Sequence, residues 1–377
     1  MRIEQCRWTP QTGWNRTPGG LAEADLVLLF AASELCASTD RFAGIVDAYP
    51  RAQIVGCSTA GEIAGTEVTD DSLVVTALAF GSTRAQSLCA PITDAAQSFE
   101  VGRDIARALD PVGLVHVLVF SEGLAVNGSD LVRGLTEHLP PGVTLTGGLS
   151  GDGEKFSATW VIWNGVAERG TVVVTGLYGP DLRVGFGSLG GWDSFGPERL
   201  ITRSTGNVLY ELDGRSALEL YKLYLGEHAE GLPATGLLFP LSLRTTEDMP
   251  GVVRTILAID EDEQSMTFAG DVPEGGYVRL MKANFDRLID GAVGAAQTSV
   301  EPLGRPGAEL GLLISCVGRK MVLGQRIEEE VEGVREVLGA EAVLAGFYSY
   351  GEISPFTMDA RCELHNQTMT ITTLSER

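Results

Sequence analysis

Hydrophobic and polar residues follow one another along the chain in a pattern that occurs three times. Each copy begins with a short apolar run, which is typical of a buried strand. A loop and an amphipathic segment follow, with apolar residues at helical spacing, and a second apolar run then ends at a glycine. The pattern covers residues 25–56, 115–147 and 312–346. It predicts three strand–loop–helix–strand units of the βαβ kind.

Strand patterns also occupy much of the chain between these units. Alternating or apolar runs bounded by turn residues predict further strands, which would pair in an antiparallel manner. The predicted elements are a strand at 72–80, a hairpin formed by 159–166 and 171–178, several strands within 235–281 and a helix at 283–297, after an irregular lead-in at 1–23.

A change in composition near residue 214, followed by a helical pattern, indicates a boundary between two halves of the chain. The length of 377 residues also favours more than one domain. We therefore predict an N-terminal half over residues 1–214 and a C-terminal half over residues 215–377. The predicted fold class is α/β, with both halves built from repeated strand–loop–helix–strand units and additional antiparallel strands.

Two turns that follow the second strand of a unit have almost the same sequence. Residues 56–63 read GCSTAGEI and residues 346–353 read GFYSYGEI, so both fit the pattern G-x-x-[ST]-x-G-E-I. Glycine permits close backbone approach, and the repeated pattern predicts that the two turns occupy equivalent positions. The turns at 121–128 and 147–153 are similar. Because ligands of open α/β sheets bind beyond the carboxyl ends of the strands, the four turns are predicted to line one pocket.

Side chains on these turns suit a small polar ligand. The planar fork of Arg319 can hold a carboxylate, and Glu62 and Glu352 could hold an ammonium group or cap a helix. The alternatives are a surface ion pair for Arg319 and core packing with a bonded hydroxyl for Tyr348 and Tyr350. The predicted ligand-binding residues are Cys57, Ser58, Thr59, Glu62, Ser121, Glu122, Gly148, Cys316, Arg319, Tyr348, Tyr350 and Glu352.

Charge and composition argue against several classes of protein. The chain has 50 acidic and 28 basic residues, and its net charge of −22 opposes binding to nucleic acid or to an anionic membrane. No apolar run is long enough for membrane insertion, and residues 1–4 do not begin a signal peptide. The six cysteines are scattered without a C-x-x-C motif, which predicts a reduced, cytoplasmic protein. No His or Cys pair has zinc spacing, so no metal site is predicted.

Four segments taken together resemble the FIST family (F-box and intracellular signal transduction): residues 56–63, 315–319, 346–353 and 365–368. The resemblance covers nearly the whole chain, as an N-terminal FIST half followed by a C-terminal FIST half. It implies a sensory input module of signalling proteins that binds small ligands such as amino acids. One bacterial branch of the family is freestanding, binds haem, senses nitric oxide and controls a partner histidine kinase.

We therefore predict a freestanding cytoplasmic sensor that binds an amino acid-like or other small polar metabolite and contains no cofactor. It would signal to a separate output protein, such as a histidine kinase or a cyclic-dinucleotide enzyme. One alternative is a haem-binding nitric-oxide sensor with His365, which lies in an alternating strand, as the axial ligand. A weaker alternative is a hydrolase or transferase that uses Ser58, Cys57 or Cys316. A nucleophile needs a base within reach, and the chain has only four histidines, so a non-enzymatic function is favoured.

Overall fold

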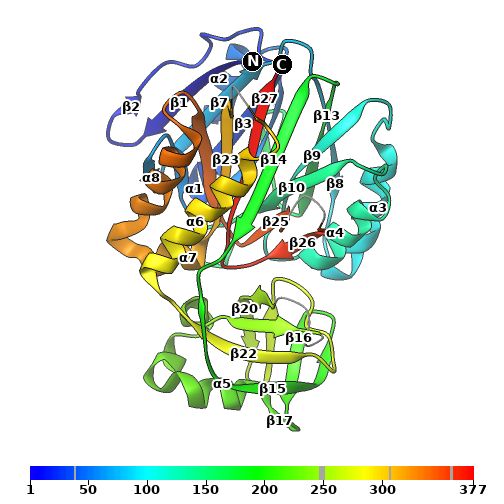
Figure 1. The fold of residues 1–377 in the computed structure, drawn as a ribbon, viewed down its shortest axis with the longest axis vertical. Helices are drawn as coiled ribbons and strands as arrows, with labels where there is room; N and C mark the ends of the chain where they lie inside the picture. Colours follow the sequence, from blue (N-terminus) through cyan, green and yellow to red (C-terminus); the bar gives the residue numbers. More distant parts are fainter. Residues whose placement is uncertain (38–39, 246–250, 305–306, 357–359) are drawn as a thin grey trace.

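The computed structural model describes every residue of the chain except 38–39, 246–250, 305–306 and 357–359. Sheets and helices form a large body, and a smaller strand-rich module lies beneath it in the view of Figure 1. The body contains parallel strand pairs joined by helices, together with many antiparallel strands. This confirms the predicted α/β fold class.

The body is built from three consecutive units of the chain. The first consists of β1 (Arg2–Thr9), β2 (Gly13–Trp14), β3 (Leu26–Ala32), α1 (Ser33–Cys36), α2 (Asp40–Ala48), β4 (Gln53–Thr59), β5 (Glu62–Ala64), β6 (Glu67–Thr69) and β7 (Leu73–Ala79). The second consists of β8 (Arg84–Pro91), α3 (Ser98–Ala108), β9 (Leu114–Ser121), α4 (Gly128–Thr136), β10 (Thr144–Leu149), β11 (Val161–Trp163), β12 (Val166–Glu168) and β13 (Thr171–Tyr178). The third consists of β14 (Leu182–Leu189), α6 (Phe285–Val300), β23 (Leu310–Cys316), α7 (Val317–Leu323), α8 (Ile327–Leu338), β24 (Val343–Ser349), β25 (Gly351–Pro355), β26 (Cys362–His365) and β27 (Met369–Glu376).

The three sheets of the body share one strand order, and each borrows a hairpin from another unit. The orders are β12-β11-β4-β3-β7-β1, then β26-β25-β10-β9-β13-β8, and β6-β5-β24-β23-β27-β14, with β2 added to the first. The hairpin of unit one pairs with β24, that of unit two with β4, and that of unit three with β10. The exchange is therefore a closed cycle, and the body is three equivalent units that cannot be separated without losing strand pairs.

A glycine marks the same place in the second parallel strand of each unit. Gly56, Gly147 and Gly346 all lie so close to the neighbouring strand that a side chain has no room. A Cβ atom would lie 1.8 Å from the carbonyl oxygen of Leu29, 1.9 Å from that of Val119 and 1.8 Å from that of Leu313, respectively. The structure thus confirms that the turns at 56–63 and 346–353 occupy equivalent positions, and it shows that the turn at 147–153 is the third copy.

The space between the three sheets is filled by a single apolar core. Phe30, Phe120 and Phe347 come from different sheets and touch one another, with ring centroids 4.7 to 6.0 Å apart. Gly148 leaves room for them, because a Cβ there would lie 2.8 Å from Ile314 and 3.4 Å from the Phe347 ring. The predicted ligand residue Gly148 is therefore a packing position. Apolar residues of the outer faces pack beneath the helices, α2 on the first sheet, α3 and α4 on the second, and α6 and α8 on the third.

The smaller module is inserted into the third unit, between β14 and α6 (Figure 1). It has its own apolar core, and the predicted boundary at residues 214 and 215 falls inside it. Its elements are β15 (Asp193–Thr205), β16 (Val208–Leu212), β17 (Arg215–Ser216), α5 (Ala217–Leu225), β18 (Leu241–Arg244), β19 (Val252–Arg254), β20 (Ile256–Asp260), β21 (Ser265–Phe268) and β22 (Tyr277–Lys282), with short 3-10 helices that include Ala234–Leu238.

Two predicted elements were wrong. The segment 161–178 does not form one hairpin, since β11 pairs with β12 whereas β13 pairs with β8 and β9. The turn lies instead at Asn164-Gly165, where both residues have positive φ, as a two-residue hairpin loop requires. The lead-in also contains a strand, because β1 pairs with β7 along its length.

Candidate functional site

The glutamates of the two repeated turns are buried, and each is hydrogen-bonded to a hydroxyl of its own turn and to a residue outside that turn. Glu62 accepts hydrogen bonds from the hydroxyl of Thr59 and from the Ser72 amide and hydroxyl, the latter two at 3.0 and 2.6 Å. Glu352 accepts from the Ser349 hydroxyl at 2.6 Å and from the Thr368 amide and hydroxyl at 3.2 and 2.9 Å. Burial raises the pKa of Glu62 to about 7 and that of Glu352 to about 8. These carboxyl groups close the turns.

The second unit uses its acidic residues in the same way. The Glu122 carboxylate follows Ser121 at the end of β9 and accepts hydrogen bonds from the Leu124 amide at 2.9 Å and the Thr159 hydroxyl at 2.7 Å. Asp152 accepts from three backbone amides of residues 156–158 and from the hydroxyl of Tyr350. The Tyr350 ring stacks on Phe156, with centroids 4.7 Å apart. Tyr350 therefore packs inside the protein with its hydroxyl bonded.

Arg319 forms a buried ion pair in the third unit. Its guanidinium donates to Glu330 from Nη2 at 2.7 Å and from Nε at 3.1 Å, and both side chains are completely buried. Two backbone carbonyl groups accept its other hydrogen bonds. Tyr348 donates to the same glutamate at 2.8 Å. The fork of Arg319 is thus occupied by a protein carboxylate, and the alternative of a surface ion pair is wrong because the pair lies in the interior.

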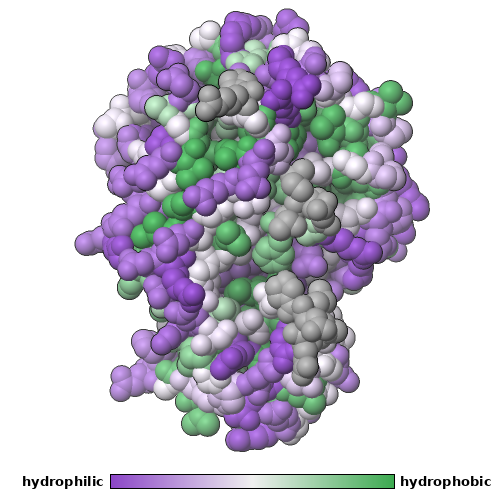
Figure 2. All heavy atoms as spheres, viewed as in Figure 1, coloured by the Kyte–Doolittle hydropathy of each residue, from purple (hydrophilic) through white to green (hydrophobic). Residues whose placement is uncertain are grey.

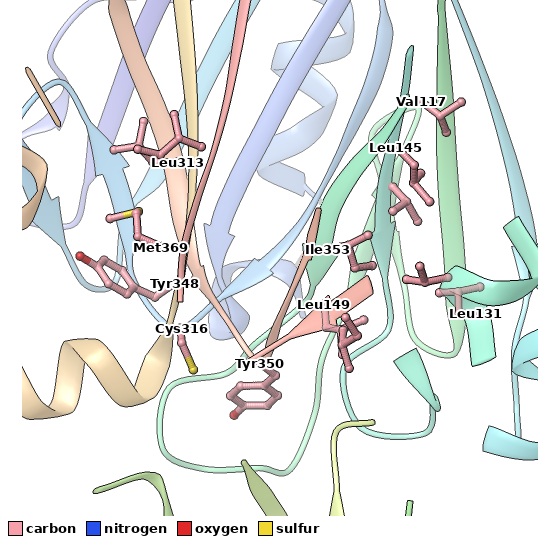
Figure 3. Close-up of a cluster of buried hydrophobic side chains, with 14 of the residues drawn as sticks. Val117, Leu131, Leu145, Leu149, Leu313, Cys316, Tyr348, Tyr350, Ile353 and Met369 are labelled. Carbon is pink, nitrogen blue, oxygen red and sulfur yellow. The ribbon is translucent and has the colours of Figure 1, made fainter. Parts of the chain in front are cut away.

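Residues 365–368 connect the strand ends to the inserted module. The Asn366 side chain donates to the Tyr350 carbonyl at 3.2 Å and accepts from the Thr255 amide, also at 3.2 Å. Gln367 donates to the Leu237 carbonyl of the module at 2.9 Å. Cys316 and Tyr350 lie at the strand ends on this side of the sheets, whereas Leu313 lies deeper within the body (Figure 3). The four predicted turns therefore form a bonded layer against which the module rests.

A cleft with a volume of about 950 Å³ lies beside this layer, between the body and the module. The surface coloured by hydropathy shows the narrowing between these two parts, where hydrophobic and hydrophilic residues meet (Figure 2). The body contributes α4, the start of β10, Phe186 and residues 360–364. The module contributes residues 243–245, Val252, Arg254, Asp271 and Pro273. None of the twelve predicted ligand residues lines this cleft.

Comparison with known proteins identifies the chain. Family models match it over two adjacent segments: the FIST N domain matches residues 25–215 and the FIST C domain matches residues 217–355. The chain belongs to the FIST family. FIST domains are generally sensory domains of signal transduction, and the matched segments confirm the predicted resemblance in both halves.

Other similarities to this FIST protein are remote. An uncharacterized protein of Methanocaldococcus jannaschii is 22% identical over an alignment of 346 residues, which covers 85% of this chain and 64% of that relative's length. Two cyanuric acid hydrolase structures, one of them from A. caulinodans, align over 99% or more of both chains, with 8% and 10% identity and TM-scores of 0.37 and 0.31. Scores this low support no conclusion about the fold or the activity.

The candidate nucleophiles of this FIST protein are buried and are not activated. The Ser58 hydroxyl donates to the Gly151 carbonyl at 2.8 Å and accepts from the Trp160 amide at 2.9 Å. Burial raises the pKa of the thiols of Cys57 and Cys316, so both stay protonated. No histidine is bonded to any of the three in the described part of the chain. The geometry gives the hydrolase or transferase alternative no support.

His365, the axial ligand of the haem alternative, does not line the cleft. Its Nε2 atom is 2.7 Å from the carbonyl oxygen of Ser354, and its ring contacts Phe356 at a centroid distance of 4.1 Å. Burial lowers the pKa of the imidazole to about 4. The arrangement therefore does not fit His365 as a ligand to iron in that cavity.

Sequence reasoning missed the residues that form the cleft. Ser129 and Arg254 are separated by 125 positions and belong to different parts of the fold, yet both line it. A possible signal was the Asn-Gly-Ser segment at 127–129, since asparagine or serine before a helical pattern marks a helix start. Nothing local in the sequence distinguishes Arg254 from the other arginines.

Proposed function

We propose that this protein is a sensory protein whose small ligand binds in the cleft between the body and the inserted module. The observation that supports the proposal is the cleft itself, with its volume of about 950 Å³ and walls from both parts of the fold. Ligand sites commonly lie between domains and combine apolar walls with a few polar groups. A ligand that contacts both walls would favour one relative placement of the module over others.

The signal would leave through the layer of turns on which the module rests. The module is continuous with the body only through the end of β14 and the start of α6, and the side chains of Asn366 and Gln367 bind it to the layer. A change in its placement therefore acts on residues next to Tyr350 and Glu352. We propose a separate output protein, such as a histidine kinase or a cyclic-dinucleotide enzyme, as the receiver. No helix in the described part of the chain is long and apolar enough to cross a membrane.

The test is a ligand screen combined with a variant that fills the cleft. Amino acids, organic acids and other small metabolites are screened by thermal shift, since a ligand at a hundredfold excess over its Kd stabilises by about 2.7 kcal/mol. Thr136, the last residue of α4, is exposed and lines the cleft, so Thr136→Trp should abolish the shift. Ala108→Trp, at the exposed end of α3, is the matched control.

The control variant should keep the shift of every ligand found in the screen. A ligand that binds the Thr136→Trp variant as well as it binds the natural protein would place the site outside the cleft. That result would contradict the proposal.

A further inference from the structure

We infer that the cleft binds a small organic anion, with Arg254 as the residue that binds its negative group. This inference rests on the proposed function and specifies the chemistry of the same site. Three features of the structure support it: an arginine without a carboxylate partner, a hydroxyl with a free hydrogen beside it, and an apolar wall opposite.

The first feature emerges from comparing the buried arginines. Arg254 and Arg319 are the arginines classed as buried in the described part of the chain, with 7% and 0% of their surface exposed. Arg319 has Glu330 at 2.7 Å, whereas no carboxylate among the described residues lies within 4.0 Å of the Arg254 guanidinium. A buried charge without a close partner is unfavourable. Burial lowers the pKa of Arg254 to about 10, although the charges of Glu363 and Asp271 act in the opposite direction from farther away. An anion from solution would supply the missing partner.

The hydrogen bonds of this guanidinium leave part of it available to a ligand. Its Nε atom donates to the Asp271 carbonyl at 3.1 Å, and Nη1 donates to the carbonyls of Leu364 and Val253 at 3.0 and 3.3 Å. Among the described residues, Nη2 has only a long contact of 3.5 Å, to the Ser129 hydroxyl oxygen. Since a guanidinium has five N–H groups, donors on Nη2 remain available.

Ser129 adds a second donor at the same place. Its hydroxyl oxygen accepts from the Asp271 amide at 3.1 Å, and no described residue accepts a hydrogen bond from the hydroxyl itself. It lies in the first turn of α4, where the helix dipole favours negative charge. Gly270 makes room for the pair, because a Cβ there would lie 2.5 Å from the Ser129 hydroxyl and 3.3 Å from Cζ of Arg254.

The charge around the cleft is unlike that of the whole protein. The chain has 50 acidic and 28 basic residues, but the described residues of the lining include four arginines (133, 244, 254 and 361) and three acidic residues (137, 271 and 363). Two of these arginines, Arg133 and Arg244, pair with carboxylates of other residues. The rest of the wall is largely apolar, which suits a carboxylate with an apolar body better than a bare inorganic anion. The apolar lining residues include Val132, Leu145, Phe186, Leu243, Val252 and Leu364.

Paired probes that differ in charge test this inference. Hexanoate and benzoate are titrated calorimetrically against hexanamide, benzamide and inorganic phosphate. We expect saturable binding of the carboxylates at concentrations up to about 10 mM, and about tenfold weaker binding of the amides and of phosphate. Arg254→Met should weaken the carboxylates by about tenfold or more, and Arg254→Lys should recover part of that loss. Arg203→Met, an exposed arginine of the same module, is the control.

Crystals soaked with 4-bromobenzoate give a result that does not depend on how well the variants fold. The bromine signal should lie in the cleft, with the carboxylate at hydrogen-bond distance from Arg254.

The outcomes separate this inference from the proposed function. If acids and amides bind equally well and Thr136→Trp abolishes the binding of both, the anion assignment is overturned but the proposed cleft site stands. Absence of carboxylate binding, phosphate binding as tight as benzoate, or bromine elsewhere would also overturn the inference. Insensitivity of all binding to Thr136→Trp would overturn the proposed function itself.

Discussion

Breaking the buried ion pair of Arg319 should cost far more stability than breaking an exposed one. Glu330→Gln keeps the shape of the side chain but removes its charge. The glutamate accepts two charge-assisted hydrogen bonds from Arg319, at 2.7 and 3.1 Å. At about 1.5 to 3 kcal/mol each, they predict a loss of about 3–6 kcal/mol in the free energy of unfolding. That range agrees with the measured cost of leaving a buried charge unpaired, about 3–5 kcal/mol.

The assay is urea unfolding at equilibrium, followed by far-UV circular dichroism and tryptophan fluorescence, whose transitions must coincide for a two-state treatment. Glu329→Gln is the matched control, because Glu329 pairs with Arg326 at 2.8 Å while both side chains are more than 40% exposed. That exposed pair should contribute less than about 1 kcal/mol. Adding Arg319→Met to Glu330→Gln should cost less than the sum of the single changes, since the unpaired cation is then gone. Equal losses for the two glutamine variants, or strict additivity, would refute the reasoning.

Two further predictions concern the repeated turns. Gly346→Ala should destabilise the protein by about 1–3 kcal/mol or more, because the new Cβ would lie 1.8 Å from the Leu313 carbonyl oxygen. The measurement is thermal unfolding, and the control is Gly44→Ala, which should not destabilise the protein because nothing lies within 4 Å of its new Cβ. Glu352 ionises near pH 4.5 when unfolded and near pH 8 when folded, so its contribution to stability is full below pH 4.5 and is lost as the pH rises to about 8. Glu352→Gln should flatten the pH dependence of unfolding in that window, and an unchanged slope would contradict the assigned pKa.

The repeated units could be predicted because their signal is local. The apolar run, the helical spacing and the terminal glycine are each contained in a short segment. The glycine is required because the neighbouring strand of the same unit lies too close for a side chain. The Asn164-Gly165 turn is equally local, but it was missed because the hairpin was predicted between 159–166 and 171–178. The strand at residues 2–9 was missed because only part of it is buried: it pairs with β7 while its burial pattern alternates weakly.

The exchange of hairpins between units could not be predicted from single segments. Short strands such as Glu62–Ala64 and Val161–Trp163 gain their partners from units far away in sequence. Their apolar residues are consistent with pairing to several different strands. Which strand each one pairs with is decided by the assembly of the three sheets into one body. The sequence therefore divides into two family segments, residues 25–215 and 217–355, whereas the body consists of three equivalent units.

The candidate site shows most clearly where local reasoning ends. Arg319 follows a buried strand beside hydroxyl-rich turns, which is a reasonable setting for a residue that binds a carboxylate, and it does bind one, from Glu330. Arg254 is the last residue of a short strand of the module, β19, and has no such partner among the described residues. The two side chains have the same chemistry, and they differ in whether a carboxylate reaches the guanidinium, as Glu330 of the following α-helix, α8, does for Arg319. Whether an arginine has a carboxylate partner depends on residues elsewhere in the fold. The structure is therefore needed to distinguish Arg254, as a candidate to bind an anion, from Arg319.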